Sequence, residues 1–164
     1  MTSVAPQPTP RRLDAFALAS EPGNERLAIS RVAETASSAG ISAGRLERLK
    51  TAVAEATMNA IEHGNKNHAE IPVDVEVIAR GDEITVAISD QGGQDAGPAD
   101  QATEAEEPDL ALKLDGTQSP RGWGLFLIRN MVDAMEVTTD GQRHTVWLTM
   151  RTSAPEGAEH DEQV

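Results

Sequence analysis

The sequence predicts a two-layer α/β sandwich, in which helices cover one face of a mixed β-sheet. Several short runs alternate apolar and polar residues, which is the period of half-buried strands. Longer stretches between them repeat apolar residues every three or four positions, as amphipathic helices do. The apolar content is mostly aliphatic, since the 164 residues include two Phe, two Trp and no Tyr. This length suits one domain.

The N-terminal part predicts a strand and then a helix. Residues 13–18 alternate as an edge strand would, with Leu13 on one face and Phe16 on the other. Pro22 and Asn24 open the helix, which runs to about residue 39 and has Leu27 and Val32 among its apolar contacts. Gly40 ends it.

A second, longer helix follows, with Ser42 as its predicted N-cap. Its apolar residues recur at spacings of three and four and form one stripe: Leu46, Leu49, Val53, Ala56 and Ala60. We expect it to stop near Gly64, because glycine can adopt the left-handed conformation that ends helices.

The rest of the chain predicts two hairpins and a helix. Residues 71–89 form a hairpin through Gly81 and Asp82, with Asp90 just beyond its second strand. Residues 91–120 form a lid, because a connection this long in a compact domain is usually a functional loop. A helix over residues 122–135 presents Leu125, Ile128, Val132 and Met135 on one face, and residues 136–139 and 144–150 form the final hairpin.

Composition excludes several functional classes. The net charge of −13 disfavours direct binding to nucleic acid or to anionic membranes. The absence of cysteine excludes disulfides and thiolate chemistry. No segment has the length of apolar sequence that a membrane helix needs, and the N-terminus is unlike a secretory signal, so we expect a cytoplasmic protein.

Both ends differ in composition from the centre. Residues 1–10 are rich in Pro and Thr, and residues 152–164 are acidic and polar. Neither segment has enough apolar side chains to form a core, so we expect a disordered leader and a disordered tail around a domain at residues 11–151.

Three groups of polar and glycine residues are candidates for ligand binding or catalysis. Glu55 and Asn59 lie four residues apart on one helix face, Asp90 and Gly92 follow a strand, and a glycine pair precedes the last helix. Singly, these patterns equally fit a solvated helix face, an Asp/Gly turn and a tight connection. The last group comprises Arg121, Gly122, Trp123, Gly124 and Leu125; a glycine turn at a helix N-terminus offers free N–H groups to phosphate.

Together and in this order, the motifs resemble the ATPase superfamily of histidine kinases, gyrase, Hsp90 and MutL, with its Bergerat-type nucleotide-binding fold. The stretches EATMNAIEHGN and RGWGLFLIRNMVD look most like the anti-sigma-factor serine/threonine kinases. The resemblance covers about residues 11–151. It implies an enzyme that uses ATP and Mg²⁺ to phosphorylate an anti-anti-sigma partner and that sequesters a sigma factor. It leaves a homodimer open.

The resemblance also implies a role for each residue. Asn59 would bind Mg²⁺, Glu55 would be the general base, and Asp90 would accept the adenine amino group beside Gly92. The phosphate-binding group would comprise Arg121, Gly122, Gly124 and Leu125.

One residue departs from the family pattern, which usually reads Asp-x-Gly-x-Gly. Here Gln94 takes the place of the second glycine, which leaves open whether ATP binding is weakened. A non-catalytic nucleotide-binding module that sequesters a partner is therefore the alternative. A histidine kinase fragment fits less well, because His63 stands where that family usually has Lys and no phospho-accepting helix pair precedes the domain. An α/β interaction domain without a ligand would require all three motifs to be coincidental.

Overall fold

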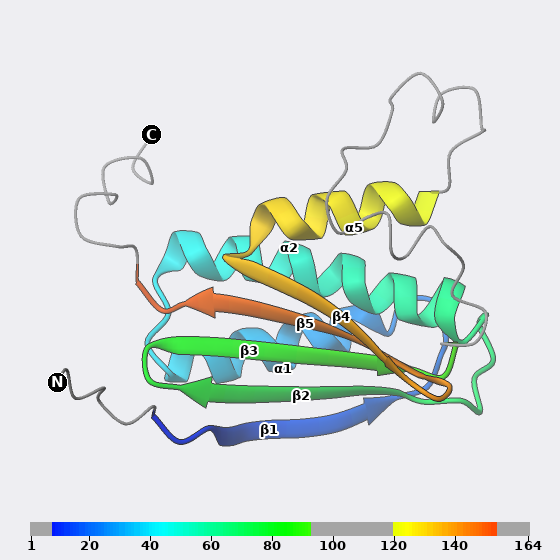
Figure 1. Ribbon diagram of the computed structural model, residues 1–164, viewed down its shortest axis with the longest axis horizontal. Coiled ribbons are helices and arrows are strands. Elements are labelled where there is room, and N and C mark those ends of the chain that lie inside the picture. Colours follow the sequence, from blue (N-terminus) through cyan, green and yellow to red (C-terminus); the bar gives the residue numbers. More distant parts are fainter. Residues whose placement is uncertain (1–7, 93–119, 154–164) are drawn as a thin grey trace, which may run out of the picture.

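A five-stranded sheet forms one layer of the molecule and helices form the other (Figure 1). The computed structural model describes residues 8–92 and 120–153, with the backbone alone for residues 120–123. The described strands are β1 (Arg11–Leu18), β2 (Val73–Arg80), β3 (Glu83–Asp90), β4 (Ala134–Asp140) and β5 (Arg143–Arg151). The described helices are α1 (Glu25–Ser38), α2 (Ala43–Asn59), the π-helical turn η1 (Ala60–Gly64) and α5 (Pro120–Met131). The predicted leader, lid and tail lie largely outside the described residues.

The sheet is antiparallel at every pairing, in the order β1-β2-β3-β5-β4. The predicted mixed sheet is therefore wrong in this respect. The reason is the final hairpin, in which β4 takes the outer edge and β5 returns beside β3. This register places Asp90, the last residue of β3, directly opposite His144 near the start of β5.

The core lies between the helices and one face of the sheet. Val73, Val75 and Val77 alternate toward it and are almost fully buried, as the sequence predicts. Helix α2 is central, since it packs on both α1 and α5 and supplies Leu49 and Val53 to the core. The opposite face of the sheet carries polar side chains that hydrogen-bond across strands, including the pairs Thr85–Thr149 and Ser89–Thr145.

Most predicted helix ends are close to the observed ones, and Gly40 has the expected positive φ of 93°. Two details of the predicted helices differ. Leu27 is 54% exposed and is not a core contact. Ser42 occupies the N-cap position of α2 with extended backbone angles, but its side chain makes no capping hydrogen bond.

Helix α5 is displaced from its predicted range of 122–135 and ends at Met131. Met135 lies in β4, opposite Leu148. No glycine or proline separates helix from strand here, and apolar residues continue across the junction. Asp133 marks the change of direction, because its N–H donates to the Thr149 carbonyl and its carboxylate accepts hydrogen bonds from Arg45 and from the Arg151 N–H.

None of the helices in the described part of the chain combines the length and apolar character needed to cross a bilayer.

Candidate functional site

Glu55 and Asn59 lie against the start of α5. A Cβ atom at Gly124 would stand 2.9 Å from Asn59 Nδ2 and 3.3 Å from Glu55 Oε2. Gly124 therefore lets α5 approach α2 at the position where both polar side chains project. The Asn59 side chain is buried, with 8% exposed, yet its Nδ2 has no hydrogen-bond partner within the described chain. A buried amide without a partner carries an energetic cost that a ligand could relieve.

The segment that follows Asn59 directs the chain toward the end of β3. After Asn59 the helix widens into η1, a single π-helical turn. This turn ends at Gly64, which lies against the Asp90 side chain. Such turns interrupt α-helices frequently at functional sites.

Gly64 has a different role from the one its position near a helix end predicts. Its φ is not positive, so it does not end the helix in the left-handed conformation. Instead, a Cβ at this position would lie 2.2 Å from Asp90 Cγ. Glycine is needed here because the carboxylate of Asp90 lies directly over its Cα atom.

Asp90 is held at the end of β3, with 2% of its surface exposed. Its Oδ1 accepts a hydrogen bond of 2.8 Å from the Gly92 N–H. Gly92 in turn lies so close to Gly64 that a Cβ would meet the Gly64 carbonyl oxygen at 2.3 Å. Asp90, Gly64 and Gly92 thus form one compact corner.

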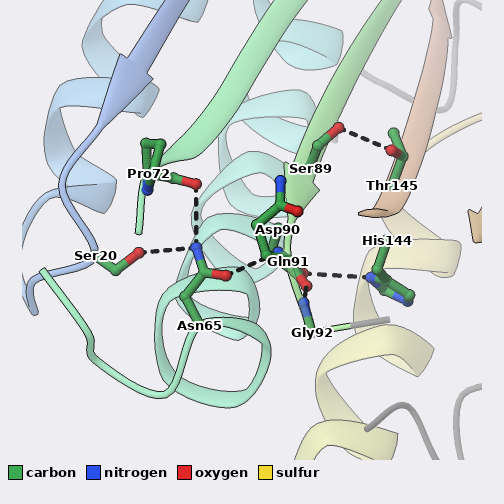
Figure 2. Close-up of polar contacts among 9 residues, drawn as sticks. All are labelled: Ser20, Asn65, Pro72, Ser89, Asp90, Gln91, Gly92, His144 and Thr145. Carbon is green, nitrogen blue, oxygen red and sulfur yellow. Dashed lines mark hydrogen bonds and ion pairs between the residues drawn. The ribbon is translucent and has the colours of Figure 1, made fainter. Parts of the chain in front are cut away.

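Asn65 fixes this corner to the rest of the sheet (Figure 2). Its Oδ1 accepts a 2.8 Å hydrogen bond from the Gln91 N–H, and its Nδ2 donates to Ser20 Oγ at 3.0 Å and to the Pro72 carbonyl at 3.2 Å. Asn65 was not among the predicted site residues. Its position after η1 becomes informative only when the course of the chain after Gly64 is known.

His144 was also not predicted. It is 1% exposed, and its Nδ1 lies 3.3 Å from Asp90 Oδ2 (Figure 2). Placing His144 beside Asp90 requires the antiparallel register of β3 and β5, in which the two residues are paired.

The remaining predicted residues lie on α5, and they are described less completely. Arg121, Gly122 and Trp123 belong to its first turn, so the glycine pair lies inside the helix and not in a turn before it. Leu125 is 1% exposed and packs in the hydrophobic core. The predicted lid and Gln94 lie outside the described residues.

The residues brought together suit a magnesium-bound nucleotide better than a protein-only metal site. Within the described ranges, no three His, Cys, Asp or Glu side chains cluster to hold a metal. Magnesium needs few protein ligands when phosphates and water complete its shell, and a carboxamide oxygen is a suitable one. The site is not identified by cavity size: a hollow of about 520 Å³ between β1 and α1 contains none of the predicted residues.

Comparison with known proteins shows the family of the chain. The model of the histidine kinase-like ATPase domain matches residues 18–150. An anti-sigma F factor of Oceanobacillus iheyensis is 34% identical over 140 residues, covering 85% of this chain and 90% of the relative. The serine-protein kinase RsbW of Listeria monocytogenes is 32% identical over 123 residues, covering 70% of each.

Two solved structures share the fold. The SiaB–SiaC complex from Pseudomonas aeruginosa contains a chain that matches with a TM-score of 0.61 at 17% identity, covering 85% of this chain and 90% of that one. The RsbU and RsbW domains of Rv1364c from Mycobacterium tuberculosis match with a TM-score of 0.59 at 18% identity, covering 87% of this chain. This chain spans 33% of that two-domain protein.

Proposed function

The chain belongs to the histidine kinase-like ATPase family, and we propose that it is an anti-sigma factor that uses Mg-ATP to phosphorylate a serine or threonine of an antagonist protein. Its similarity to an anti-sigma F factor and to the serine-protein kinase RsbW supports this assignment. The observation that carries it is the contact of Glu55 and Asn59 with the start of α5 at Gly124. One helix face thereby presents a base and a metal ligand beside backbone that can approach phosphate.

Asn59 is the proposed protein ligand of Mg²⁺. Its carboxamide is buried and its Nδ2 lacks a partner within the described chain, so the group is free to turn its oxygen toward a cation. Bound Mg²⁺ neutralises charge on the phosphates during phosphoryl transfer. Gly122 lies in the first turn of α5, where backbone N–H groups have no partner within the helix, and Arg121 adds positive charge in the same turn. Gly124 lies deeper in the helix, where the lack of a side chain keeps α5 close to Asn59.

Asp90 and Gly92 are the proposed adenine contacts. The carboxylate keeps oxygen lone pairs beyond those used by the Gly92 N–H, and it can accept a hydrogen bond from an exocyclic amine. Its fixed position at the end of β3 reduces the ordering cost of binding.

Glu55 is the proposed general base. It lies one helical turn before Asn59, and it is only partly buried, so an incoming hydroxyl group can reach it. The carboxylate would accept the proton of the attacking serine or threonine while Asn59 and the α5 N-terminus hold the phosphates.

The similarity to anti-sigma factors and serine-protein kinases implies two kinds of protein partner. The first is the antagonist that receives the phosphoryl group, and the SiaB–SiaC complex is a related fold solved with a second protein. The second is a sigma factor, held inactive by binding. A cytoplasmic location and a homodimer belong to the same proposal.

The test is phosphoryl transfer from labelled Mg-ATP to the small anti-anti-sigma proteins of the source organism. We expect Glu55→Gln to reduce transfer by about 10²- to 10⁴-fold while ATP affinity is retained, because the base acts on the hydroxyl and not on the nucleotide. Glu47→Gln is the matched control, since Glu47 lies on the same helix with its side chain 69% exposed. It should transfer phosphate as the wild type does.

Equal transfer by the wild type and Glu55→Gln would reject Glu55 as the base. ATP binding without transfer to any of these proteins would favour the non-catalytic module that sequesters its partner.

A further inference from the structure

The Asp90 carboxylate is held at both of its oxygens. Oδ1 accepts a hydrogen bond of 2.8 Å from the Gly92 N–H, and Oδ2 lies 3.3 Å from His144 Nδ1 (Figure 2). The Gly92 contact comes from the chain directly after β3, whereas His144 lies on β5, where it is paired with Asp90 across the sheet. The histidine is thus the partner that links the carboxylate to a second strand.

The contact between Asp90 and His144 has a defined direction. An ionised carboxylate accepts hydrogen bonds and has no proton to donate, so a favourable contact with Oδ2 requires a proton on Nδ1. The neutral ring meets this requirement in the tautomer that carries its proton on Nδ1. His144 therefore donates and Asp90 accepts, without any change of charge on the ring.

Packing alone does not account for a histidine at this position. The residue is 1% exposed, and its Nε2 atom is buried with no hydrogen-bond partner within the described chain. A buried polar atom without a partner lowers stability, and an apolar side chain of similar size would not have this cost. What histidine adds over such a side chain is the Nδ1–H group directed at Asp90.

The side chains next to this pair in sequence are engaged elsewhere. Ser89 and Thr145, one residue away on each strand, point to the other face of the sheet and hydrogen-bond to each other at 2.8 Å. Arg143, the residue before the histidine, forms an ion pair with Asp74 at 3.0 Å. Among the described residues, the histidine is therefore the side chain that donates to the carboxylate.

The second contact matters because it fixes the plane of the Asp90 carboxylate. A carboxylate held at one oxygen can still turn about its Cβ–Cγ bond, since terminal torsions of this kind have broad energy minima. Contacts at both oxygens remove this freedom. The lone pairs that Gly92 and His144 leave unused then point in set directions, so less of the site must be ordered when an amino group binds there.

We propose that His144 is a positioning residue, whose Nδ1–H group holds Asp90 Oδ2 so that the carboxylate accepts the adenine amino group of ATP in a fixed orientation. This inference rests on the proposed nucleotide site and deepens it. The histidine acts through Asp90 and makes no contact with the nucleotide. Its loss should therefore weaken the recognition of the amino group and leave the binding of the phosphates unchanged.

The experiment is calorimetric titration of the full chain with Mg-ATP and with the magnesium complex of purine riboside triphosphate, which lacks the amino group. For the wild type we expect about ten- to a hundredfold weaker binding of the analogue, as for loss of a hydrogen bond to a charged group. His144→Leu removes the donor. We expect this variant to bind ATP about tenfold more weakly than the wild type and to bind the analogue with unchanged affinity.

His144→Asn is the matched variant that keeps a donor. Its amide nitrogen is joined to Cβ through one carbon, as Nδ1 is, so it can donate to Asp90 Oδ2 in the same place. We expect it to recover most of the preference for ATP over the analogue. In His144→Gln the amide takes the place of Nε2 instead, so this variant should lose the preference as the leucine variant does. Melting temperatures show which variants keep the fold, and the asparagine and glutamine variants decide the question if the leucine variant does not fold.

The outcomes separate the two proposals. If the variants that lack the Nδ1 donor lose the same factor in affinity for both nucleotides, the histidine supports the fold and does not position Asp90. An asparagine variant that loses the preference as fully as they do would also reject the inference. If the wild type binds both nucleotides equally well, Asp90 does not contact the amino group, although the nucleotide site stands. If the wild type binds neither nucleotide at millimolar concentration, the proposed function itself fails.

Discussion

Gly64 shows how a single residue can be predicted at the right place for the wrong reason. The sequence marks it as the end of a helix, and a π-helical turn does end there. Its importance comes from the Asp90 carboxylate, which occupies the space where any side chain would begin. Sequence spacing cannot reveal this contact, because it joins segments 26 residues apart whose meeting depends on the whole sheet.

Replacing Gly64 with alanine should therefore damage the site more than the fold. The added Cβ must displace the Asp90 carboxylate, so we expect at least tenfold weaker ATP binding and a loss of about 1–3 kcal/mol in unfolding free energy. Calorimetry and denaturant unfolding measure the two effects.

Gly40→Ala is the matched control. Gly40 has a φ of 93° and no atom within 4 Å of the new Cβ, so alanine is strained there without touching the site. It should cost about 1–2 kcal/mol in stability and leave ATP affinity unchanged. Normal ATP binding by Gly64→Ala would mean that Asp90 does not contact the nucleotide.

At the scale of elements, strands with one buried face were predictable and the junctions between elements were not. Val73, Val75 and Val77 alternate clearly, so β2 was identified with its inward face correct. The boundary between α5 and β4 was missed, because Val132 and Met135 continue an apolar pattern that fits either element. The contacts of Asp133 at this junction include Arg45, which is 88 residues away.

The loop after η1 is the element that holds the Asp90 corner in place, and Asn65 is its anchor. Asn65→Ala removes the acceptor for the Gln91 N–H and the donor to Ser20 and to two carbonyls. We expect a loss of about 2–3 kcal/mol in unfolding free energy and weaker ATP binding, because buried partners are left unsatisfied.

Asn130→Ala serves as the control for this variant. Asn130 is exposed on α5 and donates one hydrogen bond to the Phe126 carbonyl of its own helix. We expect it to change neither stability nor affinity by a measurable amount. Denaturant unfolding monitored by circular dichroism gives the stabilities, and an Asn65→Ala protein as stable as the wild type would contradict the anchoring role.

On the scale of the whole molecule, the two ends of α2 contact different parts of the chain. Asn59 at its C-terminal end meets Gly124, whereas Arg45 near its N-terminal end donates to Asp133 at 2.9 Å. The sequence predicted the polar residues at the first end through the resemblance to a known family. It gave no indication of the second, because a single arginine in an amphipathic helix is usually exposed.

Arg45→Met should lower stability without affecting the site. Methionine can fill much of the buried volume, but the Asp133 carboxylate loses a charged donor while keeping the Arg151 N–H. We expect a loss of about 1–3 kcal/mol in unfolding free energy and unchanged ATP affinity for the folded protein. A marked loss of affinity below the melting transition would show that the two ends are coupled.

The proposed nucleotide site depends on the contact between α2 and α5, and Gly124→Ala tests this contact most directly. Alanine favours a helix over glycine by about 0.5–1 kcal/mol, whereas the new Cβ would stand 2.9 Å from Asn59 Nδ2 and 3.3 Å from Glu55 Oε2. Calorimetric titration with Mg-ATP is the measurement, alongside the melting temperature. We predict at least tenfold weaker binding in a protein that melts no lower than the wild type. Mg-ATP binding of wild-type strength by Gly124→Ala would contradict a nucleotide site between these two helices.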